Sequence, residues 1–520
     1  MEKQEIAMKL CRFTKRNVHN DLSTMSIFSP ILFLLVSILM ACRSFIHTID
    51  LSFNPETKSA TLNGIPLGKI LNPFHELGPD AFADPPQLIR SRKFQAEVHH
   101  VTTKDNYILT LHRIVNPLVP KNLRPKLKPV LLQHGLFTSS FNFLLSSDAN
   151  NDRPRFDPRD LVRTRPLNVY TPHPPFSWQK FLEYSNDYIW SRLYLTQPTD
   201  RWFAPNMSES LGFEMANQGY DVWLGNARGS TYSLNHTKYD YRSDWRYWDF
   251  SFHEIGIYDT PAQIDYILKL RKRKSLAFLG HSQGNLGMFI LQSFHPEWKD
   301  KVKPFIAMAP IAFIPNVYHG TVRVLIKLIE STVITTTQLN RVLKGRIFPK
   351  DPTTGRALDL VCLPKWTTQL CNIALSMITG DNPARTNSTL LPILAHHIPE
   401  GTSILNILHF GQMVESGQFQ AFNFGPRENL RRYGQLSAPF YPIRNIKSPD
   451  IAFVIGRTDP LSTARNVELT KSMLSVPLMD FYVISDPFWG HADYMYATGA
   501  GRLANAHMIG LMDRYRLVDM

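Results

Sequence analysis

The chain has 520 residues, of which 43% are hydrophobic and 19% charged, with a formal net charge of +14. This is an ordinary globular balance with ample length for a large core. Only four cysteines are present, which excludes a disulfide-built scaffold. The positive charges are scattered and no nucleic-acid-binding motif accompanies them, so we expect no nucleic-acid partner.

The N-terminal segment, residues 1–43, joins a basic leader to an uncharged stretch at 22–42. Its strongly apolar part, 31–40, is short for a membrane span and has the length of a signal-peptide core. Two interpretations fit: a signal peptide that begins at Met25, or an uncleaved type II membrane anchor. In both, the positive charges on the N-terminal side place the rest of the chain in the lumen.

Three N-x-S/T sequons agree with a lumenal chain, and we expect glycosylation at Asn206, Asn235 and Asn387. The segment 44–71 that precedes the core is predicted to be a linker or prosegment. These features together predict the secretory pathway. The product would be secreted, lysosomal, or anchored as a type II membrane protein with a lumenal domain.

The first elements of the core are a hairpin over 94–114, with a turn at 104–106, and a short buried strand at 129–133. That strand runs into His134, Gly135 and Leu136, the place for an oxyanion-hole loop. The glycine lets the chain turn, so that the backbone N–H of Leu136 can face a carbonyl oxygen under attack.

Residues 148–205 form an unusual stretch, rich in proline, arginine and aromatic residues. We interpret it as an insertion at the rim of the site. It would be either an additional lid that contacts lipid or a surface excursion packed on its own aromatic side chains.

The stretch at 276–294 organises the whole chain. An apolar run of strand character ends at Gly280, the sequence Gly-His-Ser-Gln-Gly occupies 280–284, and a helical pattern follows. This is the G-x-S-x-G pattern of a nucleophile elbow, in which Ser282 sits at the tip of a strained turn. The glycines on both sides let strand and helix approach each other closely.

Strands predicted at 219–225 and 305–310, with a helix at 260–270 between the first of them and the elbow, indicate a mostly parallel sheet covered on both faces. The alternation of predicted strands and helices stops over residues 311–445 and resumes with a strand at 451–455. We therefore predict a helical cap inserted before the last core strands. The cap contains Cys362 and Cys371, which either form one bridge or remain free buried thiols.

A nucleophilic serine needs a base and an orienting acid, in the chain order serine, acid, histidine. Asp459 follows the predicted strand 451–455, and His491 lies on a loop after the predicted strand 480–484. Asp486 and Asp493 are weaker candidates for the acid, and we expect Asp493 to position the loop of His491 instead. Other histidines compete less well because they lie on helices or in the cap: His295, His396, His397 and His507.

With these residues in place, the chain resembles the acid lipases of the α/β-hydrolase superfamily, which include gastric lipase and lysosomal acid lipase. The resemblance spans about residues 72 to 515 and includes the nine-residue spacing of the last two cysteines. The matching stretches are 98–109 (VHHVTTKDNYIL), 132–136 (LQHGL), 219–229 (GYDVWLGNARG), 280–284 (GHSQG), 308–310 (MAP), 416–421 (SGQFQA) and 490–493 (GHAD).

The resemblance implies an α/β-hydrolase fold and hydrolysis of neutral-lipid esters, triacylglycerol or cholesteryl ester, at a lipid–water interface. It implies Ser282 as nucleophile, His491 as base and Asp459 as its partner. The backbone of Leu136 and Gln283 would form the oxyanion hole, and Cys362 would pair with Cys371. No cofactor and no metal is expected. The implied organisation is a core at 72–310 that carries the 148–205 insertion, a cap at 311–445 and a second core part at 446–520.

Two departures from the family set this chain apart. The 148–205 insertion is not usual, and the loop after Asp459 lacks the second aspartate that the family typically carries four residues on. Two rival functions remain: a carboxylesterase for smaller soluble esters, and a lipid-binding protein with weak catalysis. The three intact residues of the predicted triad favour an enzyme.

Overall fold

The structure is a computed structural model that describes residues 51–54, 59–62, 65–66, 78–146, 152–161, 207–317, 345–347, 379–380, 382, 385 and 390–516. The chain divides into two units, Met1–Glu76 and Leu77–Met520. In the first unit, β1 (Leu51–Asn54), β2 (Ser59–Leu62) and β3 (Ile65–Pro66) form a small antiparallel sheet inside the segment predicted as a linker. The functional residues considered below all belong to the second unit.

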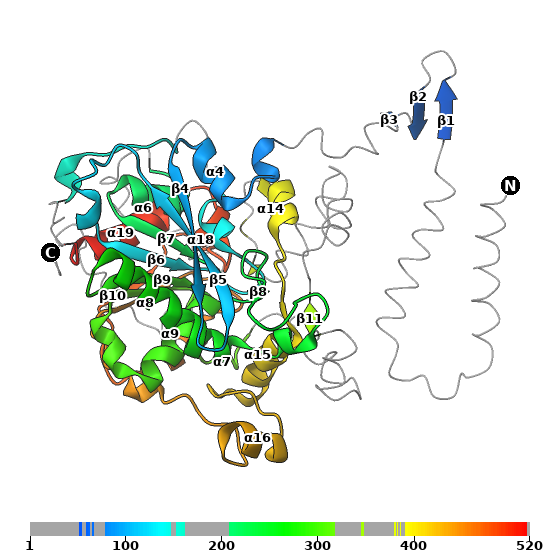
Figure 1. Cartoon of the computed structure of the whole chain (residues 1–520), viewed down its shortest axis with the longest axis vertical. Helices are drawn as coiled ribbons and strands as arrows, with labels where there is room; N and C mark the ends of the chain where they lie inside the picture. The colour runs from blue at the N-terminus through cyan, green and yellow to red at the C-terminus, as the bar shows by residue number, and fades with distance from the viewer. Residues whose placement is uncertain are drawn as a thin grey trace. The chain divides into compact units, whose positions relative to one another are not determined.

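A nine-stranded sheet forms the centre of the second unit (Figure 1). Its strands in spatial order are β14 (Asp480–Val483), β13 (Ile451–Ile455), β10 (Val302–Met308), β9 (Leu276–His281), β6 (Pro129–Gln133), β7 (Asp221–Gly225), β5 (Tyr107–Val115) and β4 (Gln95–Thr102), and β8 (Asn235–His236) pairs with β5. The strands from β14 to β7 are all parallel, whereas β5 pairs antiparallel with each of its neighbours. The predicted hairpin and the mostly parallel sheet are thus confirmed.

Both faces of the sheet are buried along the central strands β6, β7, β9 and β13, which explains why these strands are largely apolar runs, whereas the edge strand β4 is mostly exposed or half-buried. Successive side chains of a strand point to opposite faces. In β6, Val130 and Leu132 join one core cluster, and Leu131 between them joins the other. In β13, Ala452 and Val454 belong to the first cluster, whereas their neighbours belong to the second.

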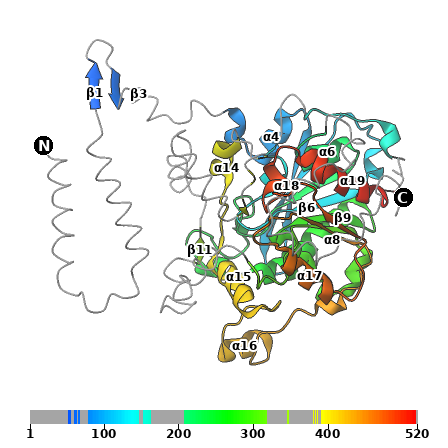
Figure 2. The same cartoon turned by 180° about the vertical axis from the view of Figure 1, so that it is seen from behind.

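Helices cover the sheet on both sides, as the front and back views show (Figures 1 and 2). Residues of α4 (Pro85–Ser91), α6 (Leu211–Asn217) and α19 (Ala506–Asp513) pack in the first cluster. Residues of α8 (Thr260–Arg271), α9 (Gln283–Phe294) and α17 (Ala464–Met473) pack in the second. Shorter helices are α7 (Phe252–Glu254) and α18 (Asp493–Tyr496), with 3₁₀ or π turns at Pro79–Ala81, Arg124–Lys126, Ser140–Phe143, Pro158–Leu161, Trp245–Trp248, Ile255–Asp259, Pro296–Asp300, Ile443–Asn445 and Gly501–Asn505.

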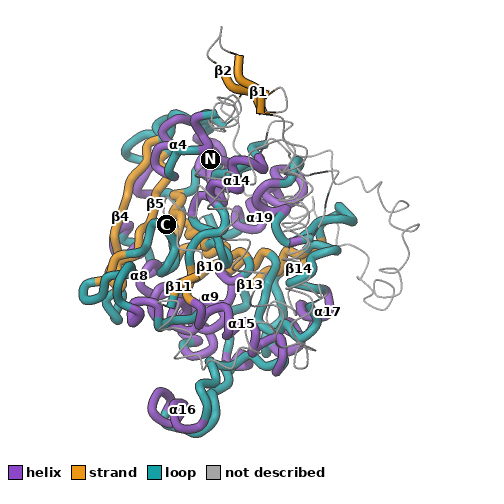
Figure 3. The backbone as a smooth tube through the Cα atoms, turned by 90° about the vertical axis from the view of Figure 1, so that its right-hand side faces the viewer, coloured by secondary structure: helices purple, strands orange, loops and turns teal. Residues whose placement is uncertain are grey.

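The predicted cap region contributes α14 (Leu391–His397), α15 (Ile404–Ser416), α16 (Pro426–Tyr433) and a short antiparallel pair, β11 (Arg346–Ile347) with β12 (Thr402–Ser403). Figure 3 shows α16 extending away from the body of this unit. Within the predicted cap, residues 318–344 and 348–378 lie outside the described residues. The cap boundaries stay a prediction.

Two other predicted segments are described in part or not at all. Within the 148–205 insertion, residues 152–161 are described, and they pack near α6: the backbone N–H of Arg155 donates to Asn217 Oδ1 at 2.7 Å. The N-terminal segment 1–43 lies outside the described residues. Among the helices that are described, none is long and apolar enough to cross a membrane.

Candidate active site

Ser282 occupies the turn between β9 and α9, in a backbone conformation that side chains rarely adopt, with φ 53° and ψ −121°. Such strain persists only where the surrounding structure holds it in place. Two backbone hydrogen bonds do so here: Ser282 N–H donates to Met308 O at 3.1 Å, and Asn285 N–H donates to Ser282 O at 2.9 Å. The serine hydroxyl therefore projects from a rigid tip.

The glycines around this turn are required by close contacts. A Cβ on Gly284 would lie 2.4 Å from Gln133 O, and one on Gly280 would lie 2.4 Å from Asn285 Oδ1. Both distances are shorter than real Cβ contacts, so the start of α9 can approach β6 only without a side chain at 284, and β9 only without one at 280. Gly135, on the loop after β6, would place a Cβ 3.1 Å from that of Ser282.

Ser282, His491 and Asp459 form one hydrogen-bonded chain. His491 Nε2 lies 2.8 Å from Ser282 Oγ, and His491 Nδ1 lies 2.8 Å from Asp459 Oδ2. All three residues are buried, the aspartate most completely. The structure thus brings together the three residues that the sequence predicts as a triad, from turns that follow β9, β13 and β14.

The carboxylate of Asp459 is held by the turn in which it lies. Its Oδ1 accepts hydrogen bonds from the backbone N–H groups of Leu461, at 2.9 Å, and Ser462, at 2.7 Å. Pro460, which directly follows Asp459, has no N–H to donate, and Ser462 Oγ donates to Pro310 O at 2.7 Å. The second aspartate missing from this loop is therefore not needed to orient the first.

The competing carboxylates have other partners. Asp493 Oδ2 accepts from Gly490 N–H at 2.7 Å and from Asn382 Nδ2 at 2.9 Å, so it supports the loop that carries His491. Burial raises the pKa of Asp493 to about 6. Asp486 pairs with Arg385 at 2.7 Å. Neither carboxylate is hydrogen-bonded to the imidazole of His491 among the contacts of the described residues.

His281, which the sequence analysis does not single out, supports the backbone of His491. Its Nε2 donates to His491 O at 2.8 Å, while His491 N–H donates to Thr379 O at 2.7 Å. Burial lowers the pKa of His281 to about 3, and the neighbouring His491 adds to this effect. His281, the residue between the first glycine and the serine of the G-x-S-x-G sequence, therefore acts as a neutral donor that fixes the histidine loop.

The loop after β6 is shaped by a second buried histidine. His134 Nε2 accepts from Ala227 N–H at 3.0 Å, so its Nδ1 carries the proton and donates to Gly135 O at 2.8 Å. Thr138 Oγ1 donates to the same oxygen at 2.9 Å. In a trans peptide the C=O and the N–H point in opposite directions. These two bonds to Gly135 O therefore set the direction of the Leu136 N–H.

The second predicted oxyanion donor is the backbone N–H of Gln283. Gln283 is the first residue of α9, so its N–H has no acceptor within the helix. This N–H and that of Leu136 come from the two backbone segments that flank Ser282. Their role as an oxyanion hole stays a prediction.

The partner of His134 lies on a loop that a buried ion pair holds in place. Arg228, next to Ala227, pairs with Asp259 at 2.6 Å, and both side chains are excluded from solvent. Arg228 also pairs with Asp105 at the hairpin turn, at 2.5 Å. The Asn-Ala-Arg-Gly sequence after β7 thus serves the loop geometry rather than the chemistry.

Buried neutral histidines predict a loss of stability in acid. Burial lowers the pKa of His134 to about 4 and that of His281 to about 3, and His112 and His409 are lowered in the same way. In the unfolded chain histidine titrates near ~6.5. Below that pH the unfolded state binds more protons, so stability is complete above it and falls towards about pH 4. We expect the Tm to decrease over this window, and a Tm that rises on acidification would contradict the assignment.

The remaining predicted sites are described less fully. Asn235 is exposed on β8, as an accessible sequon must be. Asn206, Asn387, Cys362 and Cys371 lie outside the described residues. In the part of the chain that the structure describes, no group of three histidine, cysteine or acidic side chains could hold a metal ion.

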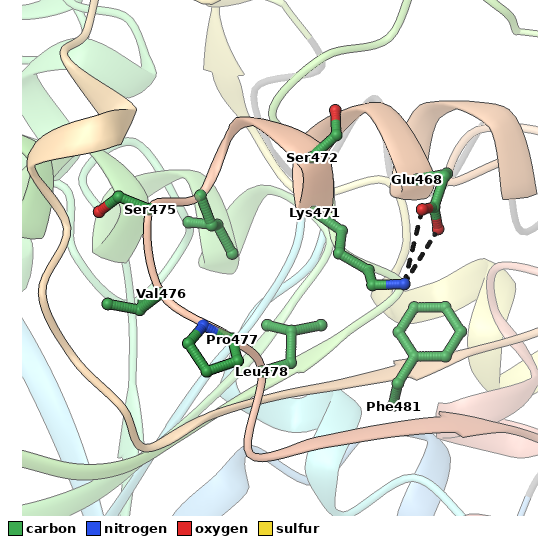
Figure 4. A pocket seen from close by; sticks show the side chains of 9 residues that line it. Glu468, Lys471, Ser472, Ser475, Val476, Pro477, Leu478 and Phe481 are labelled. Atoms are coloured by element: carbon green, nitrogen blue, oxygen red, sulfur yellow. Dashed lines mark hydrogen bonds and ion pairs between the residues drawn. The ribbon is translucent and has the colours of Figure 1, made fainter. Parts of the chain in front are cut away.

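A hollow of about 530 Å³ lies beside the C-terminal end of α17 (Figure 4). Lys471 crosses it, pairs with Glu468 at 3.4 Å and lies over the ring of Phe481. No triad residue lines it. We therefore assign it no part in the chemistry of the site.

Comparison with known proteins places this geometry in a family. Residues 85–147 match a partial α/β-hydrolase lipase region, and residues 199–380 match the α/β hydrolase fold. Gastric triacylglycerol lipase of Bos taurus is 30% identical over 449 residues, which cover 86% of this chain and 94% of that protein. The chain belongs to the α/β-hydrolase lipase family of that enzyme.

Two further relatives extend the comparison. The human gastric triacylglycerol lipase is 30% identical, with 82% of this chain and 90% of that protein covered. Lipase 1 of Drosophila melanogaster is 28% identical, covering 82% of this chain and 79% of that protein. In this lipase-family chain, Asp459 and His491 lie beyond both matched family regions. Their assignment therefore depends on their geometry next to Ser282.

Proposed function

We propose that this chain is a lipase that hydrolyses carboxylic esters of neutral lipids, triacylglycerol or cholesteryl ester, with Ser282, His491 and Asp459 as its catalytic triad. The observation that carries the proposal is the continuous hydrogen-bonded chain from Ser282 Oγ through His491 to Asp459. Its position at the carboxyl ends of parallel strands, where this fold presents catalytic groups, supports the same function.

The proposed reaction has two halves. His491 Nε2 takes the proton of Ser282 as Oγ attacks the ester carbonyl carbon, and the oxyanion is stabilised by the N–H groups of Leu136 and Gln283. The carbon–oxygen bond to the alcohol then breaks, and His491 donates its proton to the leaving alcohol. Water repeats the sequence on the acyl-enzyme and releases the fatty acid. Asp459 keeps the proton of His491 on Nδ1 and stabilises the imidazolium that forms.

The lipid substrate is supported by the relatives rather than by the triad, since a triad alone also suits a small-ester carboxylesterase. Two of the relatives described above are named triacylglycerol lipases. The sequons and the apolar N-terminal stretch support passage of the chain through the secretory pathway. Sequencing the N-terminus of the protein recovered from secreting cells distinguishes a removed signal from a retained anchor.

The test of the function uses the purified full chain with emulsified triolein, emulsified cholesteryl oleate and soluble p-nitrophenyl butyrate, from acidic to neutral pH. Ser282→Ala is the control in every arm. We expect hydrolysis of at least one emulsified lipid by the wild type and none above background by the variant. Turnover of the soluble ester alone would overturn the lipase proposal in favour of a carboxylesterase. If the wild type binds the lipids but hydrolyses none of the esters, the chain is a lipid-binding protein and not a lipase.

A further inference from the structure

A short buried segment of the cap contacts both backbone segments that carry the proposed oxyanion donors. We name this segment, residues 400–406 at the start of α15, the strap. At one end of it, Glu400 N–H donates to Phe137 O at 2.8 Å, on the residue after Leu136. At the other end, Asn406 Nδ2 donates to Gln283 Oε1 at 2.8 Å.

The strap is anchored to the core independently of these two contacts. Ser403 caps α15 by accepting Asn406 N–H at 2.9 Å, and its hydroxyl donates to Phe250 O. Ile404 N–H donates to Gly345 O at 2.9 Å, beside the β11–β12 pair. Ser403 and Asn406 have no exposed surface. A side chain fixed in this way can hold another group in position rather than follow it.

At the Glu400 end of the strap, the carboxylate of that residue forms a further contact. Its Oε2 accepts from Thr231 N–H at 3.0 Å and from the Thr231 hydroxyl, on the loop after β7. That loop also carries Ala227, the partner of His134. Among the described residues, the strap is therefore bound to three segments near the proposed oxyanion hole: the loop after β6, the loop after β7 and the start of α9.

The amide of Asn406 links Gln283 to the strap. Its Nδ2 has two hydrogen atoms, and they are directed to Gln283 Oε1 at 2.8 Å and to Thr402 Oγ1 at 3.0 Å. Gln283, itself buried, therefore has its side-chain oxygen fixed from the cap side. Its backbone N–H belongs to the peptide that joins it to the strained Ser282, and small rotations of that peptide redirect the N–H.

From these contacts we propose that Asn406 is a positioning residue, which holds Gln283 so that its backbone N–H stays directed at the oxyanion of the transition state. The inference rests on the proposed function, because it presupposes Ser282 as nucleophile. It also makes the cap a part of the catalytic geometry and not only a cover. Misplacing a preorganised donor weakens the transition state more than the bound substrate, so the effect belongs in kcat.

The experiment compares Asn406→Ala with Asn429→Ala in the full chain. Asn429 is a matched control: it is also buried, lies in α16, and donates to Asn423 Oδ1 at 2.7 Å and to Leu436 O at 3.0 Å. For each variant we would measure kcat and KM for p-nitrophenyl butyrate, inhibition by an alkylboronic acid, the rate of labelling by a fluorophosphonate, and the Tm.

For Asn406→Ala we expect kcat to fall about 10- to 100-fold, less than removal of an oxyanion donor itself, with KM unchanged within about twofold. The boronic acid, whose adduct resembles the tetrahedral intermediate, should bind more weakly by a similar factor. Asn429→Ala should have a lower Tm and an unchanged kcat. Adding Gln283→Met, which keeps the backbone N–H, to Asn406→Ala should cost little more, because the two side chains act as one unit.

Wild-type kcat in Asn406→Ala, or the same kcat loss in Asn429→Ala, would overturn the strap proposal. Additive losses in the double variant would overturn it as well. A wild type that is labelled by the fluorophosphonate but hydrolyses no lipid would overturn only the lipase proposal, since the labelling rates still decide the strap. A wild type that is neither labelled nor active would overturn both.

Discussion

Ser282→Ala is expected to lower kcat for any ester that the chain hydrolyses by about 10⁶-fold, the scale seen when the nucleophile of a triad is removed. The hydroxyl is the atom that attacks, and its hydrogen-bond partner is His491 Nε2 at 2.8 Å. Any residual rate would come from substrate binding and the oxyanion hole. Initial rates on p-nitrophenyl butyrate, with active sites counted by fluorophosphonate labelling of the wild type, measure this loss.

The fold of the variant should survive, which makes the loss interpretable. Alanine keeps the Cβ of Ser282, and the backbone bonds to Met308 O and from Asn285 N–H do not involve the hydroxyl. We therefore expect a Tm close to that of the wild type. A well-folded variant that keeps more than about a hundredth of the activity would place the nucleophile elsewhere.

Much of this site could be predicted because its parts depend on local patterns. The elbow needs glycines at 280 and 284 for close approach, and the loop after β6 needs Gly135; each leaves a short signature in the sequence. The acid and the base could be predicted because parallel strands end at one edge of the sheet, so residues after β13 and β14 lie near the end of β9. Asp493 could be excluded as the orienting acid because it lies only two residues after His491 in the same loop.

The supporting contacts could not be predicted, because they join positions far apart in the chain and have no signature of their own. His281 lies 210 residues from His491, whose carbonyl it holds, and Asn406 lies 123 residues from Gln283. In the sequence, a histidine or asparagine that only packs in the core cannot be distinguished from one that orients a catalytic group. Only the fold shows which backbone group each of them reaches.

Asp459→Asn is expected to lower kcat by about 10⁴-fold, with little change in fold. The structure explains why an amide fails here. Its carbonyl oxygen would keep the two backbone bonds from Leu461 and Ser462 that Oδ1 now accepts. The NH₂ group would then face His491 Nδ1, which must become an acceptor. The ring proton would move to Nε2, the nitrogen that must take the proton of Ser282.

Asp493→Asn is the matched control, since it changes a buried aspartate of the same loop system in the same way. The amide oxygen can accept from both Gly490 N–H and Asn382 Nδ2, so the loop and kcat should stay near the wild type. Because the pKa of Asp493 in the folded chain is raised to about 6, its ionisation costs stability above that pH. Asparagine removes this cost, so the variant should gain Tm at neutral pH, and the gain should disappear as the pH falls towards about 4.

The pair of variants separates the two carboxylates by different measurements. If kcat collapses in Asp493→Asn and persists in Asp459→Asn, the orienting acid is Asp493 and the hydrogen bond from His491 to Asp459 is incidental. If kcat collapses in both variants while both Tm values are maintained, the geometry of the His491 loop, rather than the tautomer of His491, limits the rate. The residues whose N–H groups hold Asp459 would then be the next to substitute. The contacts of the two residues predict that kcat collapses in Asp459→Asn alone, and that only Asp493→Asn gains Tm at neutral pH.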